Sequence, residues 1–333
     1  MKHVVITGGA GYVGSLLCPQ LLELGYRVTV FDTCYFGSSF LPKQHKNFSL
    51  VQGDIRDTKA LAGVFIDAEV VINLACISND ASFELDEQLS TSVNLDAFEP
   101  MVIAAKQAGV ARFIYASSSS VYGVSDQPNV TEDHPLIPLT LYNKYKGMCE
   151  PLLFRHASEE FVCTVIRPAT LCGFAPRQRL DLSVNILTNL AVNQGKITVF
   201  GGDQLRPNLH IQDMCDAYKV FIEIEASKIQ QEIFNCGYEN QSIAELALVV
   251  KKVAEEELPS LGDIEITTTP SNDNRSYHIN SDKISRVTGF QPRFSVEDAV
   301  RDLCRAFKHG QLPDSLKDDR YYNVRTLKGI QAK

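Results

Sequence analysis

Short apolar runs alternate with amphipathic segments from the first residues of this 333-residue chain. Residues 3–7 (HVVIT) form an apolar run of strand length, and the glycine-rich stretch GGAGYVG follows at once. The segment SLLCPQLLELG has the spacing of an amphipathic helix that ends at Gly25, and RVTVFD is a second strand pattern that ends at Asp32. The pattern therefore predicts a strand, a glycine turn, a helix and a strand, in that order.

The same alternation continues through the first half of the chain. FSLVQGDIRD predicts a third strand that ends at Asp54, EVVINLACISND a fourth, and residues 112–116 (RFIYA) a fifth, with FVCTVIRPATLCG as a further buried strand. Helices are expected over residues 92–109 and about 142–156. Strands that alternate with helices favour an α/β fold of the Rossmann type, with a doubly wound parallel sheet.

The pattern of hydrophobic and polar positions changes near residue 173, where shorter strand and helix patterns with more polar residues begin. We expect residues 1–173, with a returning segment near 207–232, to form the Rossmann domain. Residues 174–206 and 233–333 are expected to form a smaller mixed α/β domain at the carboxyl edge of the sheet. The polar stretch DDRYYNVRTLKGIQAK has no predicted role.

Composition excludes several classes of partner. The formal net charge is −8, from 32 Lys and Arg against 40 Asp and Glu, and no basic run occurs. An acidic chain of this kind argues against nucleic acid or an anionic membrane as the main partner. The chain enters a strand pattern at once, which predicts no signal peptide. The nine scattered cysteines fit reduced thiols of a cytoplasmic protein rather than disulfides or a metal site.

The glycines fall as Gly8-x-x-Gly11-x-x-Gly14 between the first strand and the first helix. Gly8 permits a tight turn, Gly11 lets a pyrophosphate approach the backbone, and Gly14 allows close packing of helix and strand. The helix N-terminus attracts phosphate, and Asp32 suits ribose hydroxyls while repelling a 2′-phosphate. A glycine turn occurs in many α/β proteins, but with the strand before it and the acid after it the stretch predicts binding of NAD rather than NADP.

A hydroxyl and a Tyr-x-x-x-Lys pair form the second chemical feature. Tyr142 and Lys146 are one helical turn apart, so they share a helix face, and Ser118 lies in a serine-rich loop after the fifth strand. An ammonium group near a phenol lowers the pKa of the phenol and makes it a usable base. Alternatively, the pair lies on an exposed surface and the serines form only a flexible loop.

These features occur in an order that resembles the extended short-chain dehydrogenase/reductases, specifically the NAD-dependent nucleotide-sugar epimerase/dehydratase family. The similarity runs from Met1 to at least Phe307 and rests on the motifs TGGAGYVG, GDIRD, SSSSVYG, YNKYK and FGGDQLRPNLHIQD.

The resemblance implies roles for individual residues. Ser118 would hydrogen-bond the reacting sugar oxygen, Tyr142 would accept or donate the proton, and Lys146 would bind the nicotinamide ribose and lower the pKa of Tyr142. Together with Tyr142 and Lys146, the implied NAD contacts are Gly8, Gly11, Tyr12, Val13, Asp32, Asp54, Ile55, Ala75 and Asn94. Arg206 and Arg275 would hold the nucleotide base or diphosphate, and Phe200 would lie near the base. The candidates for the sugar pocket are Ser78, Asn79 and Asp80, and Arg177, Arg179, Asp181 and Asn185.

The sequence also departs from the family pattern. Members that eliminate water from the sugar carry Asp-Glu after the catalytic Thr, whereas Ser119 and Ser120 stand here, which argues against 4,6-dehydration. Ser120 also replaces the Cys of the GDP-fucose-synthase type, so 3,5-epimerisation of that kind is not supported. Thr170 and Pro207 replace an Asn and an Asp of two further motifs, so the sugar pocket is expected to differ from that of UDP-galactose 4-epimerase.

Some residues keep two interpretations. Cys76 is interpreted either as a catalytic acid or, with better support, as a small residue of the core. Asp80 is a second base or a helix cap. Arg177 and Arg179 contact the substrate or form a solvated basic turn.

The resemblance implies an NAD-dependent nucleotide-sugar epimerase that acts by transient oxidation of the sugar at C4 through Tyr142. An NAD-dependent dehydrogenase or 4-keto reductase of nucleotide sugars would use the same residues. A dehydratase and a non-catalytic NAD(H)-binding regulator are less well supported alternatives. The family also implies a homodimer, in which the helices over residues 92–109 and 142–156 pair across a two-fold axis.

Overall fold

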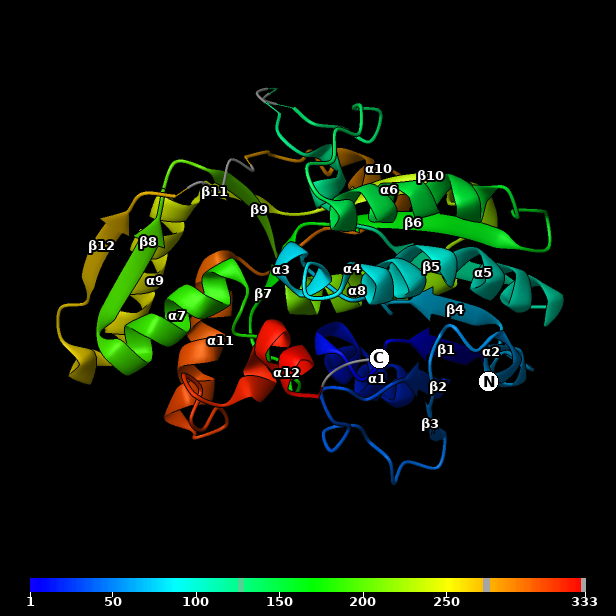
Figure 1. Cartoon of the computed structure of the whole chain (residues 1–333), viewed down its shortest axis with the longest axis horizontal. Coiled ribbons are helices and arrows are strands. Elements are labelled where there is room, and N and C mark those ends of the chain that lie inside the picture. The colour runs from blue at the N-terminus through cyan, green and yellow to red at the C-terminus, as the bar shows by residue number, and fades with distance from the viewer. Residues whose placement is uncertain (126, 128, 272–275, 331–333) are drawn as a thin grey trace.

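The computed structural model describes residues 1–125, 127, 129–271 and 276–330 (Figure 1). A seven-stranded sheet with helices on both faces forms one part of the molecule, and a smaller part with two short sheets lies beside it. This is the α/β architecture predicted from the sequence, with the smaller mixed part in its expected place.

The large sheet is parallel throughout and has the strand order β10-β6-β5-β4-β1-β2-β3. The order reverses beside β1, and the crevice at such a switch point is where open parallel sheets bind ligands. The seven strands are β1 (His3–Thr7), β2 (Arg27–Asp32), β3 (Phe48–Gln52), β4 (Val70–Asn73), β5 (Arg112–Ala116), β6 (Val162–Pro168) and β10 (Glu232–Cys236). Strand β10 comes almost entirely from the stretch that the sequence predicted to belong to the smaller domain.

Apolar residues of the strands alternate between two cores because each face of the sheet is covered by helices. Val4 and Ile6 of β1 pack with α1 and α8, whereas Val5 packs with the helices of the other face. The covering helices are α1 (Tyr12–Glu23) and α8 (Ile211–Glu223) on one face, and α2 (Thr58–Val64), α5 (Phe98–Gln107) and α6 (Leu141–Phe154) on the other.

The helix predicted over residues 92–109 is two elements. A π-helical turn, η1 (Ser92–Asp96), precedes α5, and Pro100 lies in the first turn of α5, where its missing N–H costs no hydrogen bond. Two short helices, α3 (Asp80–Phe83) and α4 (Glu87–Thr91), lead from β4 to this turn.

The smaller part contains a three-stranded sheet in the order β11-β9-β7 and the parallel pair β12-β8. Helices α7, α9 and α11 share an apolar core with β8 at the left of Figure 1. The elements are β7 (Thr170–Cys172), α7 (Ser183–Gln194), β8 (Lys196–Phe200), β9 (Leu205–His210), β11 (Glu239–Ser242), α9 (Ile243–Glu257), β12 (Glu265–Thr269), α10 (Asp282–Thr288) and α11 (Val296–Lys308).

The last helix in the described chain, α12 (Asn323–Ile330), returns from the smaller part toward the large sheet and contacts α3. A 3-10 turn, η5 (Asp319–Tyr321), precedes it, and Tyr321 and Tyr322 pack in a small apolar cluster with Leu180 and Leu303. Residues 318–330 of the polar stretch without a predicted role thus form a 3-10 turn and a helix that lie between the two parts.

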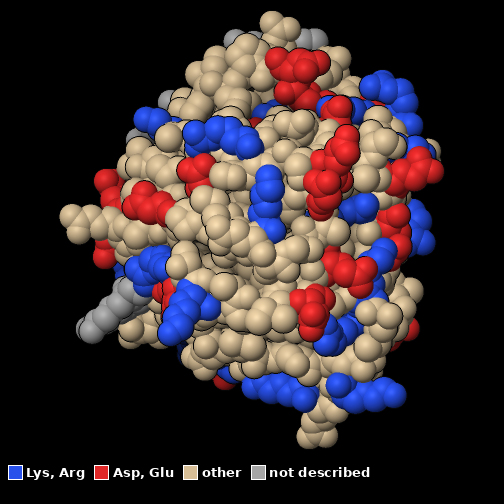
Figure 2. All heavy atoms as spheres, turned by 90° about the vertical axis from the view of Figure 1, so that its right-hand side faces the viewer, with Lys and Arg blue, Asp and Glu red and all other residues tan. Residues whose placement is uncertain are grey.

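Charge is spread over the face shown in Figure 2 rather than concentrated. Figure 2 shows Lys and Arg interspersed with Asp and Glu on the face at the right of Figure 1, without a continuous basic patch there. The nine cysteines are free thiols, as predicted. Within the described ranges, no helix has the length and apolarity to cross a membrane, and no cluster of three metal-ligating side chains occurs.

Candidate active site

A cleft of about 940 Å³ opens at the carboxyl ends of the parallel strands and is lined by both parts of the molecule. The residues predicted from the sequence that line it are Gly8, Gly11, Tyr12, Val13, Asp32, Asp54, Ile55, Ala75, Ser78, Asn79, Asp80, Ser118, Tyr142, Lys146, Arg177, Arg179, Asp181, Phe200 and Arg206. Arg275 lies outside the described residues.

The glycine turn forms one end of the cleft. Gly8 has a φ of +74°, and a Cβ on it would lie 2.5 Å from the backbone N of Ala75, so no other residue fits. A Cβ on Gly14 would lie 2.2 Å from the backbone O of Gly9, which explains the close approach of α1 to the turn. Helix α1 begins at this turn with no acidic residue in its first turn and no side-chain cap. Its N-terminal N–H groups can therefore bind a phosphate group.

Asp32 lies at the carboxyl end of β2, beside the glycine turn. Its carboxylate accepts hydrogen bonds from the backbone N–H groups of Ala10 (2.9 Å) and Cys34 (2.7 Å), which fix its orientation. Burial raises the pKa of Asp32, and the two N–H groups oppose that shift because they stabilise the charged form. Asp54 and Ile55 line the same end of the cleft. This shape and charge fit the adenosine half of NAD, with the pyrophosphate at the N-terminus of α1.

Two asparagines predicted as ligand contacts lie behind the cleft wall instead. The side chain of Asn94 both accepts from the backbone N–H of Ile77 (2.8 Å) and donates to its carbonyl (2.9 Å), so it supports the loop after β4. Asn185 is fully buried and donates to the hydroxyl of Tyr12 and the carbonyl of Arg179. Both residues shape the wall of the cleft, and neither lines it in this structure.

The serine loop follows β5 directly. The hydroxyl groups of Ser118 and Ser120 are 2.7 Å apart, and Ser120 donates to Asn143 of α6 (2.5 Å). Ser119 is buried, so the positions of the dehydratase acids hold one buried serine and one serine tied to α6. Ser118 is thereby fixed at the mouth of the loop, on the cleft.

A buried ion pair supports this loop from beneath. Ser117 donates to Glu150 (2.7 Å), which also receives two hydrogen bonds from Arg167 (2.9 and 2.6 Å). The side chains of Glu150 and Arg167 are each 3% exposed, and Arg167 also donates to the hydroxyl of Tyr122 (2.7 Å). The loop that carries Ser118 is thus tied at both ends to buried charged groups.

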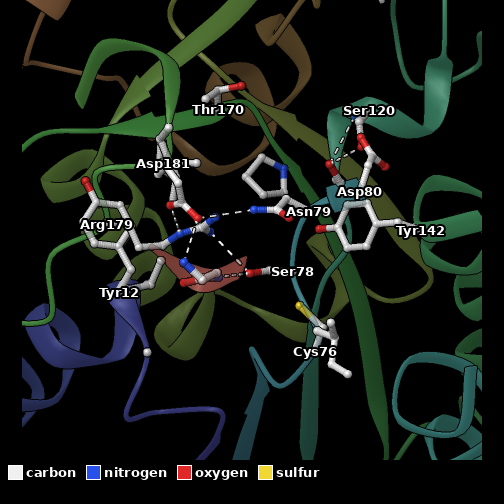
Figure 3. Close-up of a pocket in the computed structure, with 18 of the residues that line it drawn as sticks. Tyr12, Cys76, Ser78, Asn79, Asp80, Ser120, Tyr142, Thr170, Arg179 and Asp181 are labelled. Atoms are coloured by element: carbon white, nitrogen blue, oxygen red, sulfur yellow. Dashed lines mark hydrogen bonds and ion pairs between the residues drawn. The ribbon is translucent and has the colours of Figure 1, made fainter. Parts of the chain in front are cut away.

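Tyr142 and Lys146 face the cleft from α6, whose N-terminus is capped by Thr140. Figure 3 shows the hydroxyl of Tyr142 pointing into the cleft, near Asn79 and across from Arg179. Lys146 donates to the carbonyl of Ala116 (2.7 Å) and lies 5.1 Å from the centre of the Tyr115 ring. The shared face predicted for the pair is therefore present.

The electrostatic prediction for Tyr142 is wrong for the polypeptide alone. Burial is the main cause that raises the pKa of Tyr142, and the carboxylate of Asp80 adds to it. Arg179 opposes this shift. A phenolate at this position therefore depends on positive charge from across the cleft and from a bound cofactor.

Opposite Tyr142 lies a segment that we call the arginine loop, residues 177–181. Arg179 donates to Asp181 (2.9 Å) and, at 3.4 Å, to Ser78, and Asn79 lies 3.4 Å from Asp181 (Figure 3). The guanidinium of Arg177 lies 4.0 Å from the centre of the Phe36 ring, and burial together with the charge of Arg179 lowers the pKa of Arg177 to about 9. Arg177 is buried and the side chain of Arg179 is only 12% exposed, so the interpretation as a solvated basic turn is wrong.

Two residues of α12 also line the cleft and were not predicted from the sequence. Asn323 and Leu327 face it from the opposite end of the chain. Asn323 donates to Ser78 (2.8 Å) and accepts from Arg177 (2.6 Å). No local motif identifies these residues, because their contacts depend on how the chain folds back.

Phe200 and Arg206 occupy the part of the cleft formed by the smaller sheets. Phe200 ends β8 and is 58% exposed, so a flat aromatic face is available to a planar ligand group. Arg206 lies on β9 and lines the same part of the cleft. The position predicted for a nucleotide base and diphosphate therefore lies in the cleft, and its occupant stays a prediction.

The fold, the glycine turn and the set of Ser118, Tyr142 and Lys146 define the class of short-chain dehydrogenase/reductases. The family model described as "NAD dependent epimerase/dehydratase family" matches residues 4–237, more than half of the chain. The chain therefore belongs to the NAD-dependent epimerase/dehydratase family. The predicted cofactor, NAD, is confirmed with it.

Individual relatives cover nearly the whole chain. The "low-salt glycan biosynthesis protein Agl12" of Haloferax volcanii is 29% identical over 308 residues, which are 89% of this chain and 96% of that protein. A UDP-glucose 4-epimerase of Lactobacillus helveticus is 26% identical over 340 residues, covering 95% and 99%. Among solved structures, the UDP-glucuronic acid 4-epimerase of Bacillus cereus, in complex with UDP-glucuronic acid and NAD, is 25% identical and superimposes with a TM-score of 0.82 over 92% of this chain and 99% of its own.

Proposed function

We propose that this protein is an NAD-dependent nucleotide-sugar epimerase that acts by transient oxidation of the sugar at C4. The observation that carries the proposal is the convergence of Tyr142 and Ser118 on the cleft that the glycine turn also lines. Two similar proteins named as 4-epimerases, one of them solved with a nucleotide sugar and NAD, support the same reaction.

Tyr142 acts as the base in this proposal. As a phenolate it accepts the proton of a sugar hydroxyl, and the hydroxyl of Ser118 shares the hydrogen bond to the reacting oxygen. Bound NAD supplies the acceptor and later the donor of the hydride. Lys146, held by the carbonyl of Ala116, contributes an ammonium group beside the nicotinamide ribose. Tyr142 then returns the proton to the oxygen of the inverted sugar.

The two parts of the molecule divide the binding. We assign NAD to residues 1–173 with the segment near 207–232, and the nucleotide sugar to residues 174–206 and 233–333. The nucleotide is held at Phe200 and Arg206, while Ser78, Asn79 and Arg179 contact the sugar, with Asn185 behind them. An epimerase must release the sugar ring to turn while it holds the nucleotide, and the cleft of about 940 Å³ is shared by the nucleotide sugar and NAD.

A dehydratase is disfavoured by the same geometry. After oxidation at C4, dehydration removes the proton of C5 and the hydroxyl of C6, so it needs an acid and a base in addition to the tyrosine. Ser119 and Ser120 stand at the positions of these groups, and a serine supplies no carboxylic acid.

The test is turnover of nucleotide sugars by the purified protein without added cofactor. Absorbance of the denatured supernatant measures bound NAD(H), and the protein is incubated with UDP-, dTDP-, GDP- and CDP-sugars. Inversion at C4 without external NAD is the expected result. Stoichiometric formation of NADH would instead assign a dehydrogenase, and loss of water from the sugar a dehydratase. No conversion of any sugar, with NAD still bound, would contradict the proposal and favour a regulator.

We further propose a homodimer. Helices α5 and α6 lie side by side on one face of the sheet and expose Ile103 and Met148 on their outer surfaces. Pairing of these helices across a two-fold axis would bury both side chains. Light scattering after size exclusion should give twice the chain mass of 37.0 kDa, and a monomer at micromolar concentration would contradict this.

A further inference from the structure

Asn323, the first residue of α12, lies in the cleft although it is far from the other cleft residues along the chain. It is separated by 142 residues from Asp181 and by 245 residues from Ser78, and it lies beyond the stretch that matches the family model. The residue is 3% exposed. A buried side-chain amide needs hydrogen-bond partners, and the structure provides them for Asn323.

Three hydrogen bonds connect Asn323 to both sides of the cleft. Its side-chain N–H donates to the hydroxyl of Ser78 (2.8 Å), and its side-chain oxygen accepts from Arg177 (2.6 Å). Its backbone N–H donates to the carboxylate of Asp181 (3.1 Å) at the N-terminus of α12, where a negative charge is favourable. Asn323 is thus a partner of both the loop after β4 and the arginine loop.

The chain before Asn323 is held firmly against the same loop. The backbone N–H of Leu180 donates to the carbonyl of Tyr321 (2.9 Å). The hydroxyl of Tyr322 donates to the carbonyl of Ser315 (2.9 Å) and accepts from Asn189 of α7 (2.9 Å). These bonds fix the position of Asn323 relative to residues 177–181.

Arg179 is the residue that this arrangement leaves ready for a ligand. Its Nε donates to Asp181 and its Nη1 reaches Ser78, both of which also bond to Asn323. Its Nη2 is buried and has no hydrogen-bond partner among the described residues. A buried donor without a partner is costly, and a sugar hydroxyl in the cleft across from Tyr142 would satisfy it.

We propose that Asn323 is a positioning residue that orients Ser78 and Arg179 toward the hydroxyl groups of the sugar, so that α12 contributes to sugar recognition. The inference rests on the proposed function, because it requires a nucleotide sugar with its ring between Arg179 and Tyr142. In this proposal, α12 affects binding of the sugar but not binding of the nucleotide.

The test compares Asn323→Ala with Lys328→Ala, a change at an exposed position of the same helix. Calorimetry with the NAD-loaded proteins measures affinity for UDP-glucose, UDP-glucuronic acid and dTDP-glucose, and for UDP and dTDP. Asn323→Ala should weaken the best-bound nucleotide sugar about tenfold, which is the loss of one or two hydrogen bonds to a ligand-facing group, and change the free nucleotide less than twofold. Lys328→Ala should change neither.

A double variant separates positioning from a general loss of stability. If Asn323 acts through Ser78, Asn323→Ala should have a smaller effect on sugar affinity in the Ser78→Ala background than alone. Equal weakening of sugar and free nucleotide, no weakening at all, or full additivity would overturn the inference while leaving the proposed function intact. If the wild-type protein binds no nucleotide sugar, the proposed function falls first and the inference falls with it.

Discussion

The two ends of the cleft are built in different ways. At the cofactor end, the glycine turn and the N-terminus of α1 are close together near the start of the sequence. Asp32 accepts a hydrogen bond from Ala10, which is only 22 residues away. At the sugar end, side chains meet from three distant segments, with Ser78 and Arg179 separated by 101 residues. The cofactor end is local and made largely of backbone, whereas the sugar end is long-range and made of side chains.

This difference teaches how one fold can keep its cofactor and change its substrate. Backbone N–H groups recognise phosphate whatever the neighbouring side chains are, provided that glycine permits the approach. Hydrogen bonds among Ser78, Arg179 and Asp181 depend on each side chain. Substitutions at the sugar end should therefore alter selectivity, while those at the glycine turn should alter cofactor binding as a whole.

The strongest expected effect falls on Tyr142, where the two ends meet. Tyr142→Phe removes the proposed base and should lower kcat by about 10²–10⁴-fold, with little change in NAD content. Tyr145→Phe is the matched control, because Tyr145 lies on the same helix outside the cleft and packs its ring on Phe83. Steady-state kinetics and the absorbance of bound cofactor are the measurements. Equal losses in both variants would point to damage of α6 rather than to a base.

Arg167→Met removes the buried ion pair with Glu150, which supports the loop that carries Ser118. The side chain of Glu150 is only 3% exposed, so the substitution would leave it as a buried, unpaired carboxylate. The free energy of unfolding should fall by about 3–5 kcal/mol. The double variant Arg167→Met/Glu150→Leu should recover part of that loss. Urea denaturation measures both, and a loss below about 1 kcal/mol in the single variant would show that water reaches this pair.

Gly8→Ala tests the cofactor end alone. The added Cβ would lie 2.5 Å from the backbone of Ala75 at a φ of +74°, so the turn must move. NAD affinity should fall by about tenfold or more, equivalent to ~1.4 kcal/mol. Gly25→Ala is the control, since Gly25 also has a positive φ (+86°) but nothing within 4 Å of its Cβ. Fluorescence titration with NADH compares both variants with the unchanged protein, and an unchanged affinity in Gly8→Ala would contradict the expected effect of the contact with Ala75.

The smallest expected effect is that of Arg179, at the sugar end, on the pH dependence of kcat/KM. The base works when deprotonated, so kcat/KM should fall as pH falls through the pKa of Tyr142, which burial raises. Arg179 lowers that pKa, and Arg179→Met should therefore move this limb of the profile to higher pH. Lys144→Met, at an exposed position of α6, should leave the limb in place. A shift to lower pH in Arg179→Met would contradict the assignment.

The sequence predicted the cofactor end almost completely because its signals are local. A strand, Gly8, Gly14 and Asp32 follow one another at fixed spacing; Gly8 and Asp32 line the cleft, and Gly14 packs against the glycine turn. Tyr142 and Lys146 were also predictable, since one helical turn fixes their common face.

The sugar end was predicted only in part. Arg179 and Ser78 line the cleft, but Asn185 turned out to lie behind it and Asn323 was missed. Whether an amide faces the cleft or its supporting wall depends on contacts between distant segments, which no residue spacing encodes. The pKa of Tyr142 in the polypeptide alone differs from the prediction for a related reason, because the burial that raises it is a property of the folded molecule.

The position of Asn323 also sets an order of assembly on the ribosome. Synthesis runs from the N-terminus, and early segments of a chain can fold before later ones emerge. The glycine turn and the loop that carries Ser118 are complete long before Asn323, which is made 142 residues after Asp181. A nascent chain could therefore acquire its cofactor end first and close its sugar end only when α12 leaves the exit tunnel.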